Sequence, residues 1–191
     1  MKNLGIMNKT EAVQYLKRIT RSIPDYPKPG IIFRDLTTIF QDGEAFSMAL
    51  DLLTKCLVDE NSVPISFDKL VGIEARGFVL AGGLAAKIGG GVVLLRKPGK
   101  LPFEKYRLAY KLEYGEDALE IHKDAIQPGE NIVVIDDLLA TGGTAEAGCK
   151  LIEEAGGNII KALFLVELPE LEGRKKLNAY DIDSIISFDG H

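Results

Sequence analysis

The chain has 191 residues, 46% of them hydrophobic, a length that suits one well-buried α/β domain and is short for two, so we expect a single domain over residues 1–191. Its 28 acidic and 23 basic residues give a net charge of −5, which argues against nucleic acid or an anionic membrane as a partner, so that an anionic ligand needs local positive groups. The two cysteines form no C-x-x-C pair and no apolar run approaches the length of a membrane span, so we expect reduced thiols in a cytoplasmic protein.

The N-terminal part is predicted to be one peripheral helix followed by a stiff segment. Apolar side chains recur at helical spacing over residues 10–21, and Asn8 with Glu11 has the pattern of a capping box. Residues 23–36 then carry three prolines and Gly30, and have too few free N–H groups for the interior of a sheet. We expect a loop or flap there.

The middle of the chain alternates helices with short apolar strands, which is the pattern of a parallel α/β sheet. We predict an amphipathic helix at residues 44–58, introduced by Asp42, and a helix of small residues at 79–88. Buried strands are expected at residues 69–74 and 91–96.

Both of these strands end in basic residues that could hold an anion. The first runs into Arg76-Gly77 at a helix start, where a planar permanent charge adds to the positive helix end. The second is followed by Arg96, Lys97 and Lys100, three cations in five residues. Such a run is usually a solvated loop, but directly after a strand it could clamp a diphosphate leaving group.

The next segment is predicted to be a β-hairpin. Apolar and polar residues alternate over residues 106–114, a turn is expected at 115–117, and the alternation resumes at 119–122. On this pattern Glu113 lies on the polar face. A hairpin inserted between two parallel strands is suited to act as a lid, which we place at about residues 97–122.

The most informative stretch combines a strand, two acids, a glycine turn and a helix start. A run of aliphatic residues predicts a central strand that ends in Asp136 and Asp137. Gly142 and Gly143 permit a bend in which consecutive N–H groups point into one concavity, and the helix beginning near Thr144 adds its positive end. This is an anion cradle suited to a phosphate. The adjacent acids suit ribose hydroxyls or Mg²⁺ instead, because a carboxylate repels a phosphate.

The remaining elements complete the alternating pattern. The helix after the glycine turn runs to about residue 155, and a strand follows at 159–167. A polar stretch of mixed charge at residues 170–176 predicts a solvated helix, and residues 182–188 predict a final edge strand.

Residues 133–144, Val-Val-Ile-Asp-Asp-Leu-Leu-Ala-Thr-Gly-Gly-Thr, resemble the 5-phosphoribosyl 1-pyrophosphate (PRPP) motif of the type I phosphoribosyltransferases. The Leu-Leu-Ala-Thr version is similar to the adenine-specific branch of that family. Further blocks match in the family's order between about residues 24 and 177. The resemblance implies a type I phosphoribosyltransferase fold, an α/β fold whose mostly parallel sheet is flanked by helices, with an N-terminal hood at about residues 1–40 and a β-hairpin lid.

The resemblance also implies roles for individual residues. The contacts to PRPP and AMP would come from Asp136, Asp137, Ala140, Thr141, Gly142, Gly143 and Thr144. Pyrophosphate would be held by Arg76, Lys97 and Lys100. Adenine would lie against Ile32, Phe33, Arg34 and Leu168. Catalysis would involve Glu113, Tyr114 and Arg76. Mg²⁺ would be held mainly by PRPP and water, with Asp136 and Asp137 as indirect metal contacts.

Four of the residues in the matching blocks have a second interpretation. Phe33 is equally suited to a core position, and Leu168 to ordinary packing at a strand end. Glu74 could be a structural partner of Arg76 or a direct ligand. Arg96 could act on a neighbouring subunit.

The implied reaction is adenine + PRPP → AMP + pyrophosphate, a step of purine salvage, catalysed by a Mg²⁺-dependent cytoplasmic homodimer. One alternative is a PRPP- or purine-sensing regulator on the same fold, because a fold and a phosphate cradle do not guarantee turnover. Another is a phosphoribosyltransferase for a different base. Ala140 bears on this choice, because it offers only a methyl group where the enzymes for 6-oxopurines commonly place a carboxylate.

Overall fold

The centre of the molecule is a sheet of five parallel strands, in the order β4-β3-β7-β8-β9. The computed structural model describes residues 7–112 and 115–190. The strands of this sheet are β3 (Lys69–Ile73), β4 (Gly91–Leu95), β7 (Asn131–Leu139), β8 (Asn158–Glu167) and β9 (Ile182–Ser187). The parallel α/β fold implied by the sequence is therefore confirmed, with the last strand at an edge as expected.

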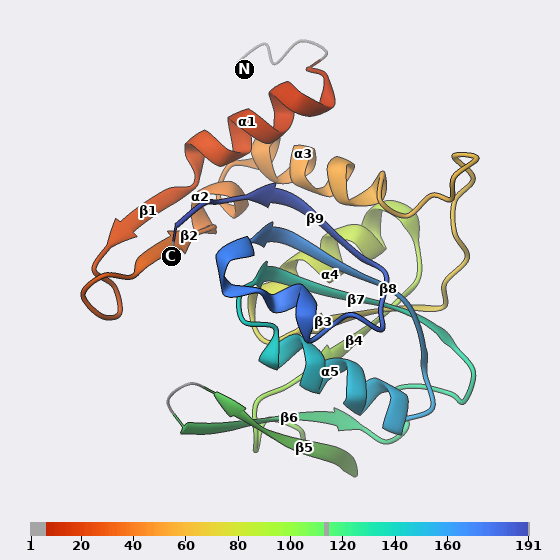
Figure 1. Cartoon of the computed structure of the whole chain (residues 1–191). Helices are drawn as coiled ribbons and strands as arrows, with labels where there is room; N and C mark the ends of the chain where they lie inside the picture. The colour runs from red at the N-terminus through yellow and green to blue at the C-terminus, as the bar shows by residue number, and fades with distance from the viewer. Residues whose placement is uncertain (1–6, 113–114, 191) are drawn as a thin grey trace.

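Helices cover both faces of this sheet (Figure 1). One face packs against the helices α1 (Lys9–Ile19), α2 (Thr37–Phe40), α3 (Gly43–Thr54) and α4 (Arg76–Ile88). The other face packs against α5 (Gly143–Glu154). Alternate side chains of a strand point to opposite faces, so neighbours such as Val133 and Val134 of β7 belong to the two different cores. Within the described residues no helix is long and apolar enough to cross a membrane.

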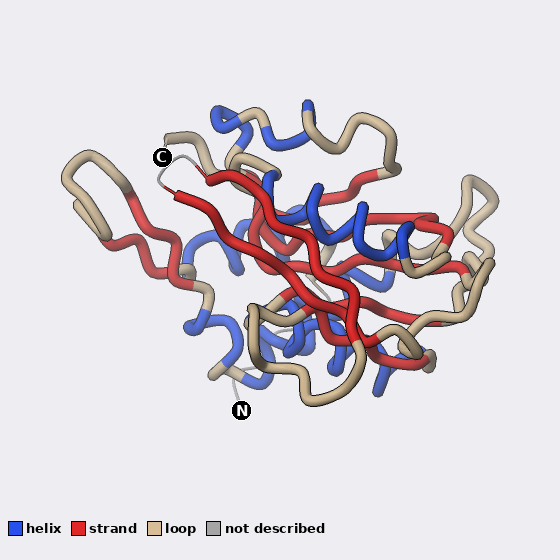
Figure 2. Tube along the Cα trace, turned by 90° about the horizontal axis from the view of Figure 1, so that it is seen from below, coloured by secondary structure: helices blue, strands red, loops and turns tan. Residues whose placement is uncertain are grey.

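Two antiparallel hairpins lie outside the central sheet (Figures 1 and 2). The first joins β1 (Arg21–Pro24) to β2 (Ile32–Asp35) and projects from the N-terminal side. The second joins β5 (Lys105–Leu112) to β6 (Gly115–His122) and packs across α5. Two short 3-10 turns, η1 (Pro169–Leu171) and η2 (Gly173–Lys175), connect β8 to β9.

Local capping signals set several element boundaries. The predicted capping box is present, because the Asn8 side chain accepts from the Glu11 amide at 3.0 Å and Glu11 returns the contact to the Asn8 amide at 2.9 Å. Asp42 caps α3 by accepting from the Glu44 and Ala45 amides, each at 3.0 Å. A cap of this kind is worth about 1 kcal/mol.

Some expected boundaries were wrong. The flap after the first helix is a hairpin, and its prolines fall at the end of β1 and in the connection, where no ladder N–H is needed. Residues 115–117, expected to form a turn, are part of β6, because Gly115 pairs with Leu112 and Asp117 with Tyr110. The predicted solvated helix at residues 170–176 is instead the pair of 3-10 turns.

Burial also differed from expectation at the β4 edge and in the hairpin. β4 is an edge strand, and Val92 and Leu94 remain 40% and 38% exposed. Glu120, expected on a polar face, is 3% exposed because its carboxylate accepts from the Gly99 amide at 3.0 Å and lies 3.4 Å from the Lys105 ammonium. Cys149 is a buried free thiol, as expected, and burial raises its pKa to about 12.

Candidate active site

The candidate site lies where the order of the strands reverses. The chain leaves β3 for β4 on one side and later returns to β7 on the other side of β3. In open parallel sheets the carboxyl ends of the strands at such a point form a crevice that binds ligands. Here the end of β3 supplies Arg76 and the end of β7 supplies Asp136 and Asp137.

The two acids have different surroundings. Asp137 is 5% exposed, and its carboxylate forms an ion pair with the guanidinium of Arg76. Asp136 accepts a hydrogen bond from the Asp137 amide at 2.9 Å. Burial, followed by the neighbouring charge of Asp137, raises the pKa of Asp136 well above its ordinary value. Asp136 therefore releases its proton less readily than an isolated carboxyl.

Arg76 reaches Asp137 because α4 starts unusually close to β7. A Cβ built on Gly77, at the second position of α4, would lie 2.7 Å from the carbonyl oxygen of Ile135 and 3.1 Å from Oδ1 of Asp136. Only glycine permits this approach without a shift of the helix. The position of Arg76 is thus set by the absence of a side chain at the next residue.

The phosphate loop, residues 140–144, follows β7 and opens into α5. Gly142 is the N-cap of α5, with φ of +78°, a conformation that glycine adopts readily. The Glu146 amide donates to the Gly142 carbonyl at 2.9 Å, which starts the helix ladder. The amides at the first turn of a helix have no partner within it and carry its positive end. This arrangement is the anion cradle that the sequence predicts.

Glu74 holds the basic loop after β4 in place. Its carboxylate accepts from the Arg96 side chain at 2.9 Å and from the Lys97 amide at 2.6 Å. Burial opposes ionisation, but these two hydrogen bonds and the charge of Arg96 outweigh it and lower the pKa of Glu74. Its partner is therefore Arg96 and not Arg76, which corrects the pairing considered from the sequence.

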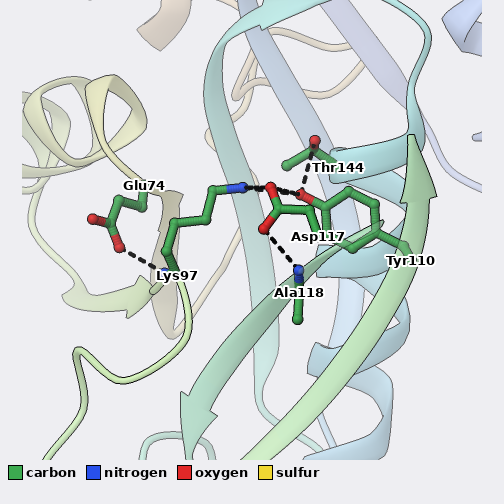
Figure 3. A network of polar contacts seen from close by, with 6 residues as sticks. All are labelled: Glu74, Lys97, Tyr110, Asp117, Ala118 and Thr144. Carbon is green, nitrogen blue, oxygen red and sulfur yellow. Dashed lines mark hydrogen bonds and ion pairs between the residues drawn. The ribbon is translucent and has the colours of Figure 1, made fainter. Parts of the chain in front are cut away.

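The ammonium of Lys97 points away from that loop toward the hairpin (Figure 3). It forms an ion pair with Asp117 of β6 and donates to the Tyr110 hydroxyl of β5 at 3.0 Å. The same hydroxyl lies 3.2 Å from Oγ1 of Thr144 in the phosphate loop. One tyrosine thus connects the basic loop, the hairpin and the start of α5.

Beside these contacts lies a pocket of about 230 Å³. The pocket is lined by Glu74, Ala75, Arg76, Lys97 and residues 136–145. This lining includes the acids Asp136 and Asp137, the whole phosphate loop, and the two cations Arg76 and Lys97. Acidic and basic side chains therefore meet around a small, polar space, with Arg76 paired directly with Asp137. Such a space suits a ligand with several phosphate and hydroxyl oxygens.

Comparison with known proteins gives this site a family. The model of the phosphoribosyl transferase domain matches residues 37–191. The chain belongs to the phosphoribosyltransferase family. The adenine phosphoribosyltransferase of Parvibaculum lavamentivorans is 51% identical over 178 residues, which cover 92% of this chain and 99% of that one. That of Rubrobacter xylanophilus is 49% identical over 184 residues, covering 95% and 97%.

Solved phosphoribosyltransferase structures have the same architecture. The adenine phosphoribosyltransferase of Thermoanaerobacter pseudethanolicus superposes with a TM-score of 0.87 at 48% identity, covering 92% of this chain and 99% of that one. The Saccharomyces cerevisiae enzyme, in complex with adenine and an imino-altritol bisphosphate, gives 0.87 at 37% identity, covering 93% and 99%. The type I phosphoribosyltransferase fold implied by the sequence is thereby confirmed.

Other residues that the family resemblance singled out lie outside the pocket lining. Lys100 is exposed in the loop after β4. Leu168 is buried behind the phosphate loop, and its amide donates to the Leu139 carbonyl at 2.9 Å. Glu113 and Tyr114 fall outside the described residues.

The three hood residues of this phosphoribosyltransferase lie on strand β2. Phe33 packs edge-on against Tyr26, with ring centroids 5.3 Å apart. Arg34 donates to the Ser22 hydroxyl at 2.6 Å and stacks on Phe188, with 4.4 Å between the guanidinium and the ring centroid. Ile32 lies opposite Pro24 in the hairpin. Proline has no N–H, so Pro24 cannot donate a hydrogen bond to the Ile32 carbonyl.

Sequence reasoning missed Tyr110 and Asp117 as parts of the site. Alternation alone put Tyr110 on an apolar stripe and Asp117 in a turn. The observed register pairs Tyr110 directly with Asp117, so both side chains lie on one face of the hairpin. A turn placed two residues earlier would have brought them together from the sequence.

Proposed function

We propose that this phosphoribosyltransferase transfers the 5-phosphoribosyl group of PRPP to adenine, giving AMP and pyrophosphate in purine salvage. The observation that carries the proposal is the single pocket that joins an acid pair, a glycine turn at a helix start and two cations. Relatives of about half identity that are named adenine phosphoribosyltransferases support the same substrates. The Saccharomyces cerevisiae relative supports them further, since it was solved with adenine bound.

The phosphate loop would hold the 5-phosphate. Residues 141–144 line the pocket at the start of α5, where their amides and the hydroxyls of Thr141 and Thr144 would donate to the phosphate. Asp136 and Asp137 would then accept hydrogen bonds from the ribose hydroxyls. As pyrophosphate leaves, positive charge develops at the ribose C1, and nearby carboxylates stabilise it.

The cations that line the pocket would hold the pyrophosphate. Arg76 and Lys97 line the pocket, and Lys100 would join them from the exposed loop. Lys97 is paired with Asp117, so the diphosphate must compete with that carboxylate for its ammonium. These cations would stabilise the transition state mainly by neutralising the negative charge that develops on the leaving group.

A magnesium ion fits the same pocket. Among the described residues no three potential metal-ligating side chains cluster, and the pocket offers only Asp136 and Asp137 as carboxylates beside Glu74. Mg²⁺ keeps several waters and is commonly bound by one or two carboxylates together with substrate phosphates. Asp136 and Asp137 would therefore contact it through water while PRPP supplies direct ligands, and the ion would neutralise charge on the diphosphate.

The two hairpins would close the site. β2 would place Phe33 against the adenine ring and leave the Ile32 main chain to read the purine edge, with Arg34 nearby and Leu168 packing from the strand end. Glu113 and Tyr114 would act from the tip of the β5–β6 lid, Glu113 by exchanging a proton with the purine or ordering the closed state. Exclusion of water matters because water would otherwise hydrolyse PRPP.

We also propose a cytoplasmic homodimer. Apolar side chains remain exposed near the edge of the sheet formed by β4, where Val79, Val92 and Leu94 are 44%, 40% and 38% exposed. A second copy could cover them. The contribution of Arg96 to a neighbouring subunit belongs to this proposal.

The test is pyrophosphate release on mixing the protein with Mg²⁺, PRPP and each of several bases in turn. Release with adenine and with no other base is the expected result. Binding of PRPP without release would point to a regulator instead. Gel filtration with light scattering measures the dimer independently.

A further inference from the structure

The segment between β8 and β9 folds back onto the phosphate loop. A Cβ built on Gly173, the first residue of η2, would lie 2.3 Å from the Ala140 carbonyl oxygen and 3.1 Å from the Gly142 nitrogen. Conversely, a Cβ on Gly142 would lie 2.5 Å from the Gly173 carbonyl oxygen. The two backbones are therefore in direct contact, without a side chain between them. A contact that holds Gly173 in place therefore also holds the backbone of Ala140 and Gly142 in the phosphate loop.

Arg174 is the residue that fixes it. Its Nε donates to Oε1 of Glu167 and its Nη2 to Oε2, both at 2.8 Å, which makes a bidentate pair at the end of β8. Its Nη1 donates to the Ile182 carbonyl at 3.0 Å, and Nη2 also reaches the Ser184 hydroxyl at 3.1 Å, both on β9. One side chain thus ties η2 to two strands of the central sheet.

The carboxylate that receives Arg174 is itself firmly held. Glu167 is 7% exposed, and it also accepts from the Ser184 hydroxyl at 2.6 Å. The planar fork of arginine matches a carboxylate in two parallel hydrogen bonds, which gives orientation as well as energy. Lysine, with a single flexible ammonium, cannot reproduce that geometry.

We infer that Arg174 is a positioning residue for the phosphate loop: by its bidentate pair with Glu167 it holds Gly173 against Ala140 and Gly142, and so sets the turn whose amides receive the 5-phosphate. The inference rests on the proposed function, which assigns that phosphate to this loop. Arg174 itself does not line the pocket. Its effect should therefore be confined to ligands that carry the phosphate.

The experiment compares AMP, which carries the 5-phosphate, with adenine, which does not, by calorimetry on the full chain. Arg174→Met should weaken AMP binding about tenfold and raise KM for PRPP similarly, with smaller changes in kcat and in adenine affinity, because small displacements of binding groups are costly. Arg174→Lys should recover part of the loss. Gly173→Ala should act in the same direction without changing any charge, since its Cβ must push Ala140 away.

Arg174→Met also leaves Glu167 buried and unpaired, so Glu167→Gln combined with Arg174→Met provides a folded alternative with no orphaned charge. Lys161→Met is the matched control, because Lys161 forms ion pairs with Asp181 at 2.8 Å and Asp183 at 2.9 Å at the opposite end of β8. It should lower stability and leave AMP affinity unchanged.

Equal AMP affinity in the wild-type chain and the double variant would overturn the inference, as would equal losses for AMP and adenine. Failure of the proposed function is a separate result. It would be seen as absence of AMP binding and of turnover in the wild-type chain, before any substitution is made.

Discussion

Lys97 and Asp117 form an ion pair that joins the loop after β4 to strand β6 of the hairpin (Figure 3). Burial opposes the charge on Asp117, but the hydrogen bond from Lys97 and the Ala118 amide outweigh it and lower the pKa of Asp117. The carboxylate is therefore ionised near neutral pH. The residue proposed to hold pyrophosphate is already engaged by an anion of the lid, and a diphosphate has to displace it.

The first prediction is that Asp117→Asn binds pyrophosphate more tightly. The pair is partly solvated, with 33% of the Lys97 and 27% of the Asp117 side chain exposed, so the gain should be small, about threefold in Kd. Titration calorimetry with pyrophosphate and Mg²⁺ measures it. Glu104→Gln is the control, since it removes the same charge from an exposed pair with Lys123. Weaker binding in Asp117→Asn would mean that Asp117 orients Lys97 and does not compete for it.

A second prediction concerns the acid pair. Replacing Asp136 and Asp137 together by Asn should depress kcat by about two orders of magnitude, because the carboxylates stabilise charge that develops only as pyrophosphate leaves. The same variant frees Arg76 from its buried partner. Steady-state kinetics at several Mg²⁺ concentrations test both effects. An unchanged kcat with unchanged Mg²⁺ dependence would contradict the role given to the pair.

A third prediction uses the pH dependence of stability. Burial raises the pKa of Glu167, but the hydrogen bonds from Arg174 and Ser184 outweigh it and leave the pKa below the ordinary 4.5. A carboxyl with a lowered pKa stabilises the fold above its unfolded pKa, and this contribution is lost as the pH falls through the folded value. In Arg174→Met the carboxylate loses its partner. The difference in free energy of unfolding between wild type and variant should therefore be larger near pH 7 than near pH 3.

Urea unfolding of both proteins at the two pH values measures that difference. Lys161→Met is again the reference variant. It breaks the ion pairs of Lys161 with Asp181 and Asp183 and leaves the pair of Arg174 with Glu167 intact. A gap between wild type and Arg174→Met that stays constant from neutral to acid pH would show that the ionised form of Glu167 gains no stability from Arg174.

Much of the fold followed from local signals that the structure confirms. The capping box at Asn8 and Glu11, the apolar run of β7 and the glycine turn before α5 are each short in sequence, and each is governed by the physics of neighbouring residues. The hairpin was also predicted, but its turn was misplaced because Gly115 signals a turn more strongly than the cross-strand packing that draws it into β6.

The parts that could not be predicted depend on contacts between segments. Nothing in a polar stretch of mixed charge distinguishes Arg174 from its neighbours until β8 and β9 bring Glu167 and Ser184 beneath it. Likewise Glu74 forms its ion pair with Arg96, although Arg76 is nearer in sequence. Arg76 is already paired with the buried Asp137. Which of several cations pairs with which acid is decided by tertiary geometry.

A fourth prediction concerns Glu113, which lies outside the described residues. Glu113→Leu should lower kcat by about two orders of magnitude, the range typical of a general acid or base. Glu116→Leu, in the same hairpin, is the control and should have little effect. If kcat barely moves while KM for adenine rises, Glu113 is a binding contact only.

The last prediction is the choice of base, and it depends on Ala140. Ala140 lines the pocket directly after β7, and its side chain is a methyl group that cannot take a proton from a purine nitrogen. On the proposed function the purine edge is read by main-chain groups around Ile32, and Pro24 opposite it has no N–H to bond the Ile32 carbonyl. Main-chain groups can complement the amine and N1 of adenine, whereas a 6-oxopurine reverses that pattern of donors and acceptors and leaves desolvated groups unpaired. Mismatches of this kind can discriminate by roughly 10⁴-fold.

We therefore expect strong use of adenine and negligible use of hypoxanthine, guanine or orotate. Competitive steady-state assays decide the matter, and a kcat/KM for hypoxanthine within about tenfold of that for adenine would refute both the specificity and the role assigned to Ala140.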